Sequence, residues 1–220
     1  DIDFKKTVDS TREILELMRV YNYKAHLIYP SSPAVQGEHP DSPIKENYIG
    51  KPISPYGRHK KIAEDYCYNY SQKYGLNIST VRLFSVYGNG LKKQLLWDAC
   101  NKLLSAEEKV VFYGTGNEIR DFIHVSDVMR LFDVLLIKNN AHLLINGGTG
   151  NKNTIRNITE MIRDKINPSI KINFNNHTST GNPSFYCADL NNLKELGFYS
   201  KKNLDFEIGN YIQWVRGVCD

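Results

Sequence analysis

The sequence predicts an α/β fold built on a parallel β-sheet. Short runs of apolar and β-branched residues alternate along the chain with longer amphipathic segments. This alternation is typical of parallel sheets, because the chain crosses back over the sheet through a helix before it starts the next strand. Turn-forming stretches rich in glycine or proline end several of the strand-like runs, as at Tyr87-Gly88-Asn89-Gly90. No internal repeat or low-complexity tract interrupts this order.

Each element is predicted from its own pattern. Residues 8–20 repeat apolar side chains with helical spacing, and residues 57–74 end at a glycine, a common helix stop. A polar, proline-rich loop joins the first strand to the second helix. The expected helices are residues 8–20, 57–74, 93–104, 126–138, 154–166, 190–196 and 204–217. The expected strands are residues 25–29, 78–86, 110–113, 143–146 and 170–174.

The composition excludes several classes of protein. Hydrophobic residues make up 41% of the 220 residues and charged residues 24%, which indicates a globular chain. No stretch approaches the roughly 18 consecutive apolar residues of a membrane span. The first residues carry neither a secretory signal nor an initiator methionine, so we expect the natural N-terminus to lie upstream.

Charge and cysteine spacing exclude two further functions. The net charge of +4 is dispersed, whereas a nucleic-acid-binding protein usually concentrates basic residues in a stripe. We therefore interpret the basic pairs as solvated surface. These pairs are Lys5-Lys6, Lys60-Lys61, Lys92-Lys93 and Lys201-Lys202. The four cysteines have no zinc-binding spacing, which predicts free thiols in a reducing cytoplasm and no metal site.

The pair Tyr56 and Lys60 is the first candidate for catalysis. At the start of a helix, residues four apart share a face, so both side chains are expected to point into one site. The pKa of a free tyrosine is about 10, and lowering it to about 7 requires roughly 4 kcal/mol in favour of the phenolate. A nearby ammonium and a positively charged cofactor ring are expected to supply this. Tyrosine and lysine are both common here, so the pair alone fits a solvated helix surface better than a catalytic site.

Several further blocks follow in order. Ser31-Ser32-Pro33-Ala34-Val35-Gln36-Gly37 comes directly after a predicted buried strand, at the strand end where ligands of open α/β sheets gather. Arg82-Leu83-Phe84-Ser85-Val86-Tyr87-Gly88 repeats this strand-then-loop pattern. Gly114-Thr115-Gly116 leads through Arg120-Asp121-Phe122-Ile123-His124-Val125 to Asp127. Asn146-Gly147-Gly148-Thr149-Gly150, Gly181-Asn182-Pro183 and Ala188-Asp189 complete the series.

These ordered blocks resemble the extended short-chain dehydrogenases that act on nucleotide sugars, the NAD-dependent epimerase/dehydratase family. The resemblance runs from about residue 8 to residue 200. It implies a Rossmann-like, doubly wound parallel sheet with a smaller C-terminal α/β substrate-binding domain. Residues 1–90 are then expected to be the C-terminal part of the NAD-binding domain. Residues 91–220 are expected to be mainly the substrate domain, with residues 120–146 returning to the first.

The resemblance also implies residue roles. Ser32, Tyr56 and Lys60 match the catalytic triad, with Tyr56 and Lys60 also holding the cofactor. Arg120 matches an arginine that binds the nucleotide diphosphate, a role that suits its forked donors. The remaining matches are Leu83 and Phe84 near the cofactor, Ser85 near the substrate phosphates, Val111 and Tyr113 beside the nucleotide base, and Asn182 near the substrate. NAD is the expected cofactor, with NADP left open, and a nucleotide-diphosphate sugar is the expected ligand.

The chain departs from the family pattern in one large respect. The family's Gly-x-x-Gly-x-x-Gly motif, which binds the dinucleotide pyrophosphate, has no match here. We expect the N-terminal dinucleotide-binding portion to lie outside this sequence, and the alternative is a non-catalytic remnant that binds nucleotide sugars. Smaller departures are Gln36 for a tyrosine, Ser85 for an asparagine, and Ser179 and Thr180 for an Arg-Pro pair.

The reaction expected from the resemblance is epimerisation at sugar C4 through a 4-keto intermediate. No carboxylate follows Ser32, which argues against the dehydratases of the family, although a ketoreductase or dehydratase remains the alternative. The family usually pairs through a four-helix bundle that includes the helix carrying the tyrosine and lysine. A homodimer is therefore expected, with packing inside the chain as the alternative for that helix.

Overall fold

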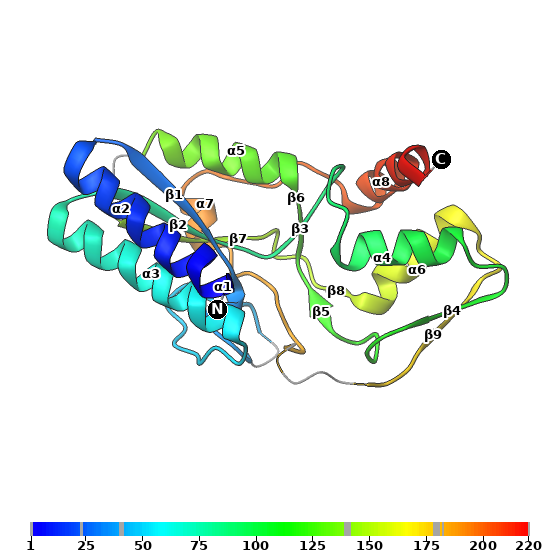
Figure 1. The fold of residues 1–220 in the computed structure, drawn as a ribbon. Coiled ribbons are helices and arrows are strands. Elements are labelled where there is room, and N and C mark those ends of the chain that lie inside the picture. The colour runs from blue at the N-terminus through cyan, green and yellow to red at the C-terminus, as the bar shows by residue number, and fades with distance from the viewer. Residues whose placement is uncertain are drawn as a thin grey trace.

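A three-stranded parallel sheet forms the first half of the molecule (Figure 1). The computed structural model describes residues 2–22, 24–39, 42–138, 142–177, 181 and 183–219. Strands β1 (His26–Ser31), β2 (Asn77–Leu83) and β7 (His142–Gly147) lie in the order β1-β2-β7, and both pairings are parallel. This confirms the predicted α/β fold with a parallel sheet. The register aligns Ser31 with Arg82 and Arg82 with Asn146, so the carboxyl ends of the three strands meet at one edge.

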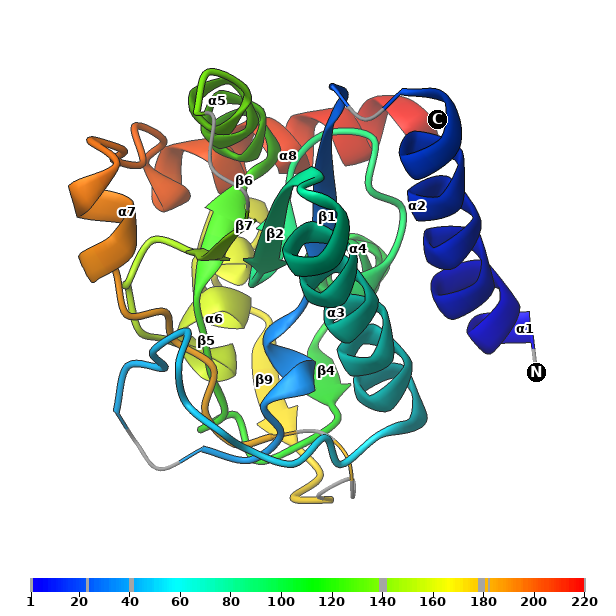
Figure 2. The same ribbon diagram turned by 90° about the vertical axis from the view of Figure 1, so that its left-hand side faces the viewer.

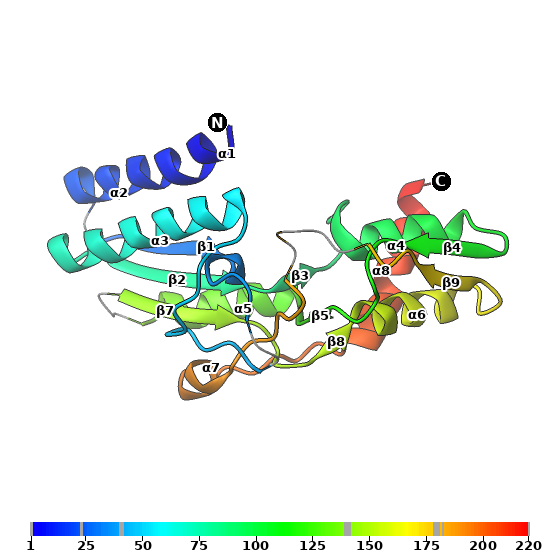
Figure 3. The ribbon, with the colours of Figure 1, turned by 90° about the horizontal axis from the view of Figure 1, so that it is seen from below.

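Helices cover both faces of this sheet, as Figures 2 and 3 show. Helices α2 (Ser10–Tyr21) and α3 (Pro55–Tyr74) lie on one face, and α5 (Val125–Leu136) and α7 (Asn191–Glu195) lie on the other. Leu15 of α2 and Cys67 of α3 pack in one buried cluster, while Leu131 of α5 packs with Ile145 in another. Sheet strands buried on both faces explain the nearly continuous apolar runs that predicted them.

Helix α3 begins two residues earlier than the pattern predicted, and its first turn shows why. Ser54 is the N-cap, and its hydroxyl accepts a hydrogen bond of 3.1 Å from the Gly57 amide. Pro55 occupies the first turn, where its missing amide proton costs nothing. The helix ends as predicted at Gly75, whose φ of 68° lies in the left-handed region that favours glycine.

The single strand expected over residues 78–86 is divided into two. Phe84 separates β2 from β3 (Ser85–Tyr87). The Phe84 amide still donates to the Gly147 carbonyl oxygen of β7, but the Ser85 amide donates to the Asp121 carbonyl oxygen at 2.9 Å. β3 then pairs with β6 (Phe122–His124). The chain therefore changes its strand partner at Phe84, which turns the segment after β2 toward the second half of the molecule.

The N-terminal helical segment also starts earlier than expected. α1 (Ile2–Phe4) and a π-helical turn (Lys5–Asp9) lead directly into α2. The Asp3 carboxylate is 2.6 Å from the Nδ1 atom of His59 on α3, and the Phe4 ring packs edge-on against the same histidine. These contacts hold the start of the chain against the helix that carries Tyr56 and Lys60.

The second half of the molecule has its own core. Helices α4 (Gln94–Leu104), α6 (Ile155–Ile166) and α8 (Leu204–Cys219) pack together beside the parallel pair β4 (Lys109–Phe112) and β9 (Lys171–Phe174). A short antiparallel pair, β5 (Ile119–Arg120) with β8 (Asn153–Thr154), lies between this core and the sheet (Figure 1). The division into two domains near residue 90 stays a prediction. None of the described helices is both long and apolar enough to cross a membrane.

Two partly buried histidines, His26 and His142, are expected to make the stability of the fold depend on pH. Burial lowers the pKa of His26 and of His142, so the folded state favours their neutral forms. Below the ordinary histidine pKa of about 6.5, the unfolded chain takes up protons that the folded chain does not. The melting temperature is therefore expected to fall between pH 7.5 and pH 5, and to fall less in the His142→Gln variant. Opposite contributions from Asp121 and Glu46, whose pKa values burial raises, are common to both proteins and cancel in the comparison. If the melting temperatures of the two proteins fell by the same amount between pH 7.5 and pH 5, this prediction would be contradicted.

Candidate functional site

The catalytic candidates meet where β1 ends. Ser32 directly follows β1 and caps the short 3₁₀ helix Pro33–Val35, accepting a hydrogen bond of 3.2 Å from the Ala34 amide. The same hydroxyl interacts with the phenol of Tyr56, which lies in the first turn of α3. Two segments that are separated by the long polar loop are thus brought together at the carboxyl end of the sheet.

Gly57 makes this approach possible. A Cβ atom at this position would lie 2.4 Å from the Ala34 carbonyl oxygen, far inside contact distance. Only a glycine lets the first turn of α3 lie this close to the loop that carries Ser32. The residue following Tyr56 is therefore part of the site, although the sequence reasoning passed over it.

Lys60 lies one helical turn beyond Tyr56 on the same face, as the spacing predicted. Its ammonium donates a hydrogen bond of 2.9 Å to the Pro30 carbonyl oxygen, lies 4.9 Å from the centroid of the Tyr29 ring and lies 6.0 Å from the centroid of the Tyr56 ring. The positive charge is thus held at the edge of the site by β1 rather than directly against the phenol.

The pKa of Tyr56 differs from the expectation. Burial raises the pKa of Tyr56 above its usual value, and the nearby Ser32 hydroxyl only partly opposes this. Lys60 does not lower it, since its ammonium lies closer to Tyr29 than to Tyr56. The residues of this chain therefore keep Tyr56 protonated, and the expected lowering by Lys60 is not found in this structure.

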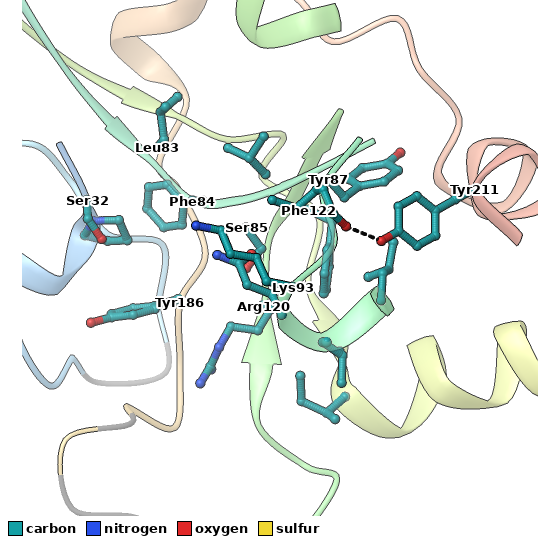
Figure 4. Close-up of a pocket in the computed structure, with 17 residues that line it drawn as sticks. Ser32, Leu83, Phe84, Ser85, Tyr87, Lys93, Arg120, Phe122, Tyr186 and Tyr211 are labelled. Carbon is teal, nitrogen blue, oxygen red and sulfur yellow. Dashed lines mark hydrogen bonds between the residues drawn. The ribbon is translucent and has the colours of Figure 1, made fainter. Parts of the chain in front are cut away.

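A cavity of about 380 Å³ opens beside Ser32 (Figure 4). Its described lining includes Leu83, Phe84 and Ser85 at the junction of β2 and β3, together with Arg120 at the end of β5. Five of the predicted site residues therefore share one space. Tyr56 and Lys60 do not line it, but Ser32, which does, interacts with Tyr56.

A second cavity, of about 480 Å³, adjoins the first. Arg120 lines both, so it stands at their junction. Tyr113 lines the second cavity, and its ring stacks on that of His177 with centroids 6.2 Å apart and planes inclined by 17°. Two connected spaces that share an arginine suit an elongated ligand with an anionic centre.

The arginine is held by strands on both sides. β5 pairs with β8 through Arg120 and Asn153, and the Tyr186 amide donates to the Ile119 carbonyl oxygen at 2.9 Å. The Arg120 guanidinium carbon lies 5.4 Å from the centroid of the Tyr186 ring, and burial lowers the arginine's pKa. Two rigid neighbours thus fix the position of this cation at the junction.

The adjacent Asp121 has a structural role. Its fully buried carboxylate accepts hydrogen bonds from the Thr149, Gly150 and Ala188 amides and from the Thr149 hydroxyl, at 2.6–3.1 Å. It therefore ties the end of β5 to the loop after β7 and to the chain near residue 188. The glycine-rich loop predicted from the sequence allows this close approach, since a Cβ atom on Gly148 would lie 2.5 Å from the Asp121 carboxylate.

One predicted substrate residue, Val111, lies away from both cavities, and another, Asn182, lies outside the described residues. Val111 lies on β4 and is half exposed, but it lines neither cavity. Asn182 lies outside the described residues, as do Ser179 and Thr180. The roles assigned to these residues stay predictions.

Several lining residues of the first cavity were not among the predicted site residues, and Tyr186 and Lys93 are the two polar ones that bear most on ligand binding. Tyr186 precedes the Ala188-Asp189 block by two positions, and this proximity was the available signal. Lys93 was assigned with Lys92 to solvated surface, yet its side chain lines the cavity opposite Ser32 (Figure 4). Among the described residues, no cluster of histidine, cysteine and acidic side chains could hold a metal ion.

An open parallel sheet with a cavity beyond the carboxyl ends of its strands defines the class of doubly wound α/β proteins, which bind ligands at this edge. The sequence profile of the NAD dependent epimerase/dehydratase family matches residues 2–146, and the chain belongs to this family. The chain is 30% identical over 191 residues to a UDP-glucuronate 4-epimerase of Thermodesulfobacterium geofontis, an alignment that covers 86% of this chain and 58% of that protein.

Solved structures agree on the fold. The UDP-glucose 4-epimerase of Thermotoga maritima with UDP-glucose superposes with a TM-score of 0.89 at 24% identity, over 99% of this chain and 71% of that one. The UDP-N-acetylglucosamine 4-epimerase of Methanobrevibacter ruminantium gives 0.88 at 24% identity, over 97% and 70%. At these identities the likeness shows the fold alone. The chain spans 58 to 61% of the length of three curated relatives that it matches.

Proposed function

We propose that this chain is the catalytic and substrate-binding part of a nucleotide-sugar 4-epimerase that uses NAD. The observation that carries the proposal is the position of Ser32, whose hydroxyl interacts with Tyr56 and which at the same time lines the cavity that contains Arg120. A proton-transfer group and a binding site for an anionic ligand therefore meet at one hydroxyl. UDP-sugar 4-epimerases among the relatives and structural neighbours support the same reaction.

The nucleotide sugar is proposed to lie across both cavities. Its sugar occupies the first cavity beside Ser32, its diphosphate lies at Arg120, and its base reaches Tyr113 in the second cavity. Arg120 suits the diphosphate because its planar fork matches phosphate oxygens. The Tyr113 ring offers a flat surface on which a base can stack.

NAD is proposed to bind at the carboxyl ends of β1 and β2. The residues present fit the nicotinamide end: Leu83 and Phe84 lie beside Ser32, and the Lys60 ammonium is fixed next to Tyr56. β1 is an edge of the described sheet, and we propose that residues outside this chain complete the dinucleotide site. Bound NAD+ supplies one piece of chemistry, the reversible acceptance of a hydride from sugar C4.

Tyr56 is proposed to move the proton that accompanies this hydride. As a phenolate, it takes the proton of the C4 hydroxyl, with Ser32 holding the same oxygen, and a 4-keto sugar results. It returns the proton when the hydride re-enters from the other face. The protein alone keeps the pKa of Tyr56 high, so the positive charge of bound NAD+ has to favour the phenolate.

Two alternative functions could be carried out at this site. A 4-ketoreductase or dehydratase would share the Ser32, Tyr56 and Lys60 set, but Pro33 and Ala34 follow Ser32 where the dehydratases of the family carry acids. A non-catalytic module that binds nucleotide sugars would keep Arg120 without needing Tyr56. Purified full-length protein distinguishes them, since an epimerase converts a UDP-hexose to its C4 epimer with no net consumption of NADH.

A homodimer is also proposed. Ile14, Leu17, Val20 and Tyr21 of α2 are exposed apolar side chains on a helix that packs beside α3. Exposed apolar side chains grouped on one helix are typical of an interface, and here three of them share a hollow with the charged side chains of Arg12, Glu13 and Glu16. Sedimentation of the full-length protein tests it, and a monomer at micromolar concentration would count against it.

A further inference from the structure

The first cavity carries an excess of positive charge that the proposed function leaves unassigned. Its described lining contains two cations, Arg120 and Lys93, and no carboxylate. The two carboxylates of the second cavity are both engaged within the protein. Glu118 accepts hydrogen bonds from the Thr115 and Gly116 amides, and Glu38 accepts two from Ser184. Burial lowers the pKa of Arg120 and both carboxylates partly oppose this electrostatically, whereas neither of these described carboxylates forms an ion pair with Lys93.

Lys93 differs from its neighbour Lys92. The Lys92 ammonium lies 6.0 Å from the centroid of the Trp97 ring and outside both cavities. Lys93 lines the first cavity, and among the residues that the structure describes none forms a hydrogen bond, ion pair or ring contact with it. A cation that enters a cavity without a protein partner is a candidate for binding an anionic ligand.

The backbone around Lys93 is held in an unusual conformation. Lys93 is the N-cap of α4, and Gln94 has a φ of 68°, in the left-handed region that residues other than glycine seldom adopt. Such conformations concentrate at ligand-binding sites, where the surrounding structure imposes them. Here the conformation accompanies the turn that brings both Lys93 and Gln94 into the cavity lining.

The opposite wall lacks a strong phosphate ligand. Ser85, which stands where the family pattern has an asparagine, offers only a short hydroxyl. Figure 4 shows Ser85, Lys93 and Arg120 around the same space, with Ser32 on its far side. Two cations and an absence of carboxylates match the two negative charges of a nucleoside diphosphate ester.

We propose that Lys93 is a second diphosphate-binding residue, contacting the phosphate nearer the sugar while Arg120 holds the other. This rests on the proposed function, because it requires a nucleotide diphosphate in these cavities. A lysine in this position acts as a point charge that complements the fork of Arg120. It makes binding dependent on the diphosphate rather than on the nucleoside alone.

Calorimetric titration of the full-length protein with UDP and with uridine tests the proposal. Lys93→Met is expected to weaken UDP binding about tenfold, the loss of one partly exposed charge-assisted contact, and to leave uridine binding unchanged. Lys93→Arg, which keeps the charge, is expected to bind UDP nearly as the unmodified protein does. Lys92→Met is the matched control and is expected to bind both ligands normally.

Three outcomes separate the possibilities. Equal UDP binding by Lys93→Met and the unmodified protein would overturn the proposal. So would a loss confined to UDP-glucuronic acid, which would assign Lys93 to a sugar carboxylate. If the unmodified protein binds neither UDP nor UDP-glucose, the proposed function fails and the assignment of Lys93 fails with it.

Discussion

Replacing Tyr56 with phenylalanine is expected to lower kcat for C4 epimerisation by about a thousandfold, while binding of the nucleotide sugar changes little. The substitution removes only the hydroxyl that interacts with Ser32 and leaves the ring in the first turn of α3. Tyr186 also lines the first cavity, but its ring lies against the Arg120 guanidinium, with 5.4 Å between the guanidinium carbon and the ring centroid. Steady-state kinetics with bound NAD, together with titration by UDP, measure the two effects separately.

Tyr68→Phe is the control for this experiment. Tyr68 lies on the same helix and is half exposed, and its ring contacts His142 rather than the site. It is expected to keep normal kcat. A Tyr56→Phe enzyme with unchanged kcat would remove the proton-transfer role and favour a non-catalytic module that binds nucleotide sugars.

The largest stability effect is expected at Glu64. Its carboxylate makes a two-pronged ion pair with Arg82, at 2.9 Å to Nε and 2.8 Å to Nη2, and both side chains are almost completely buried. Glu64→Gln leaves the Arg82 charge buried without its counterion, which costs about 3–5 kcal/mol. In a chain of this size the melting temperature is expected to fall by roughly 10 °C. Because the pair joins α3 to β2, activity at a permissive temperature should fall as well.

Two further variants test this explanation. Asp65→Asn removes the exposed ion pair between Lys61 and Asp65 on the same helix and is expected to cost less than about 1 kcal/mol. The double variant Glu64→Leu and Arg82→Leu removes both charges and should recover part of the loss. A Glu64→Gln protein that melts like Asp65→Asn would show that the buried pair contributes no more than a surface pair.

The sequence was sufficient for the order and type of the main elements. The spacing of the apolar residues, with the glycine and proline residues between them, predicted the first strand and the two helices around the site. It did so because apolar side chains in these elements pack in a sheet that is buried on both faces. The break at Phe84 could not be predicted, since it depends on β2 and β3 having different partners far along the chain. Ser54 and Pro55 are typical of a helix start, so the true start of α3 could have been predicted, but the predicted helix began at residue 57.

The site was predicted in part for a similar reason. Residues that belong to ordered sequence blocks, such as Ser32 and Arg120, line the cavity. Lys93 belongs to no such block, and nothing local distinguishes it from Lys92; only the turn at Gln94 brings it inward. The pKa of Tyr56 also required the structure, because burial and the distance to Lys60 decide its direction.

The most direct measurement follows a deuterium atom at sugar C4. The full-length protein with NAD is incubated with UDP-glucose labelled at C4, and the products are analysed by mass spectrometry and NMR. The account predicts UDP-galactose that retains deuterium at C4, with no net NADH, because the hydride leaves and re-enters the same carbon. Product without the label, stoichiometric consumption of reduced cofactor, or no epimer from any UDP-hexose would contradict it.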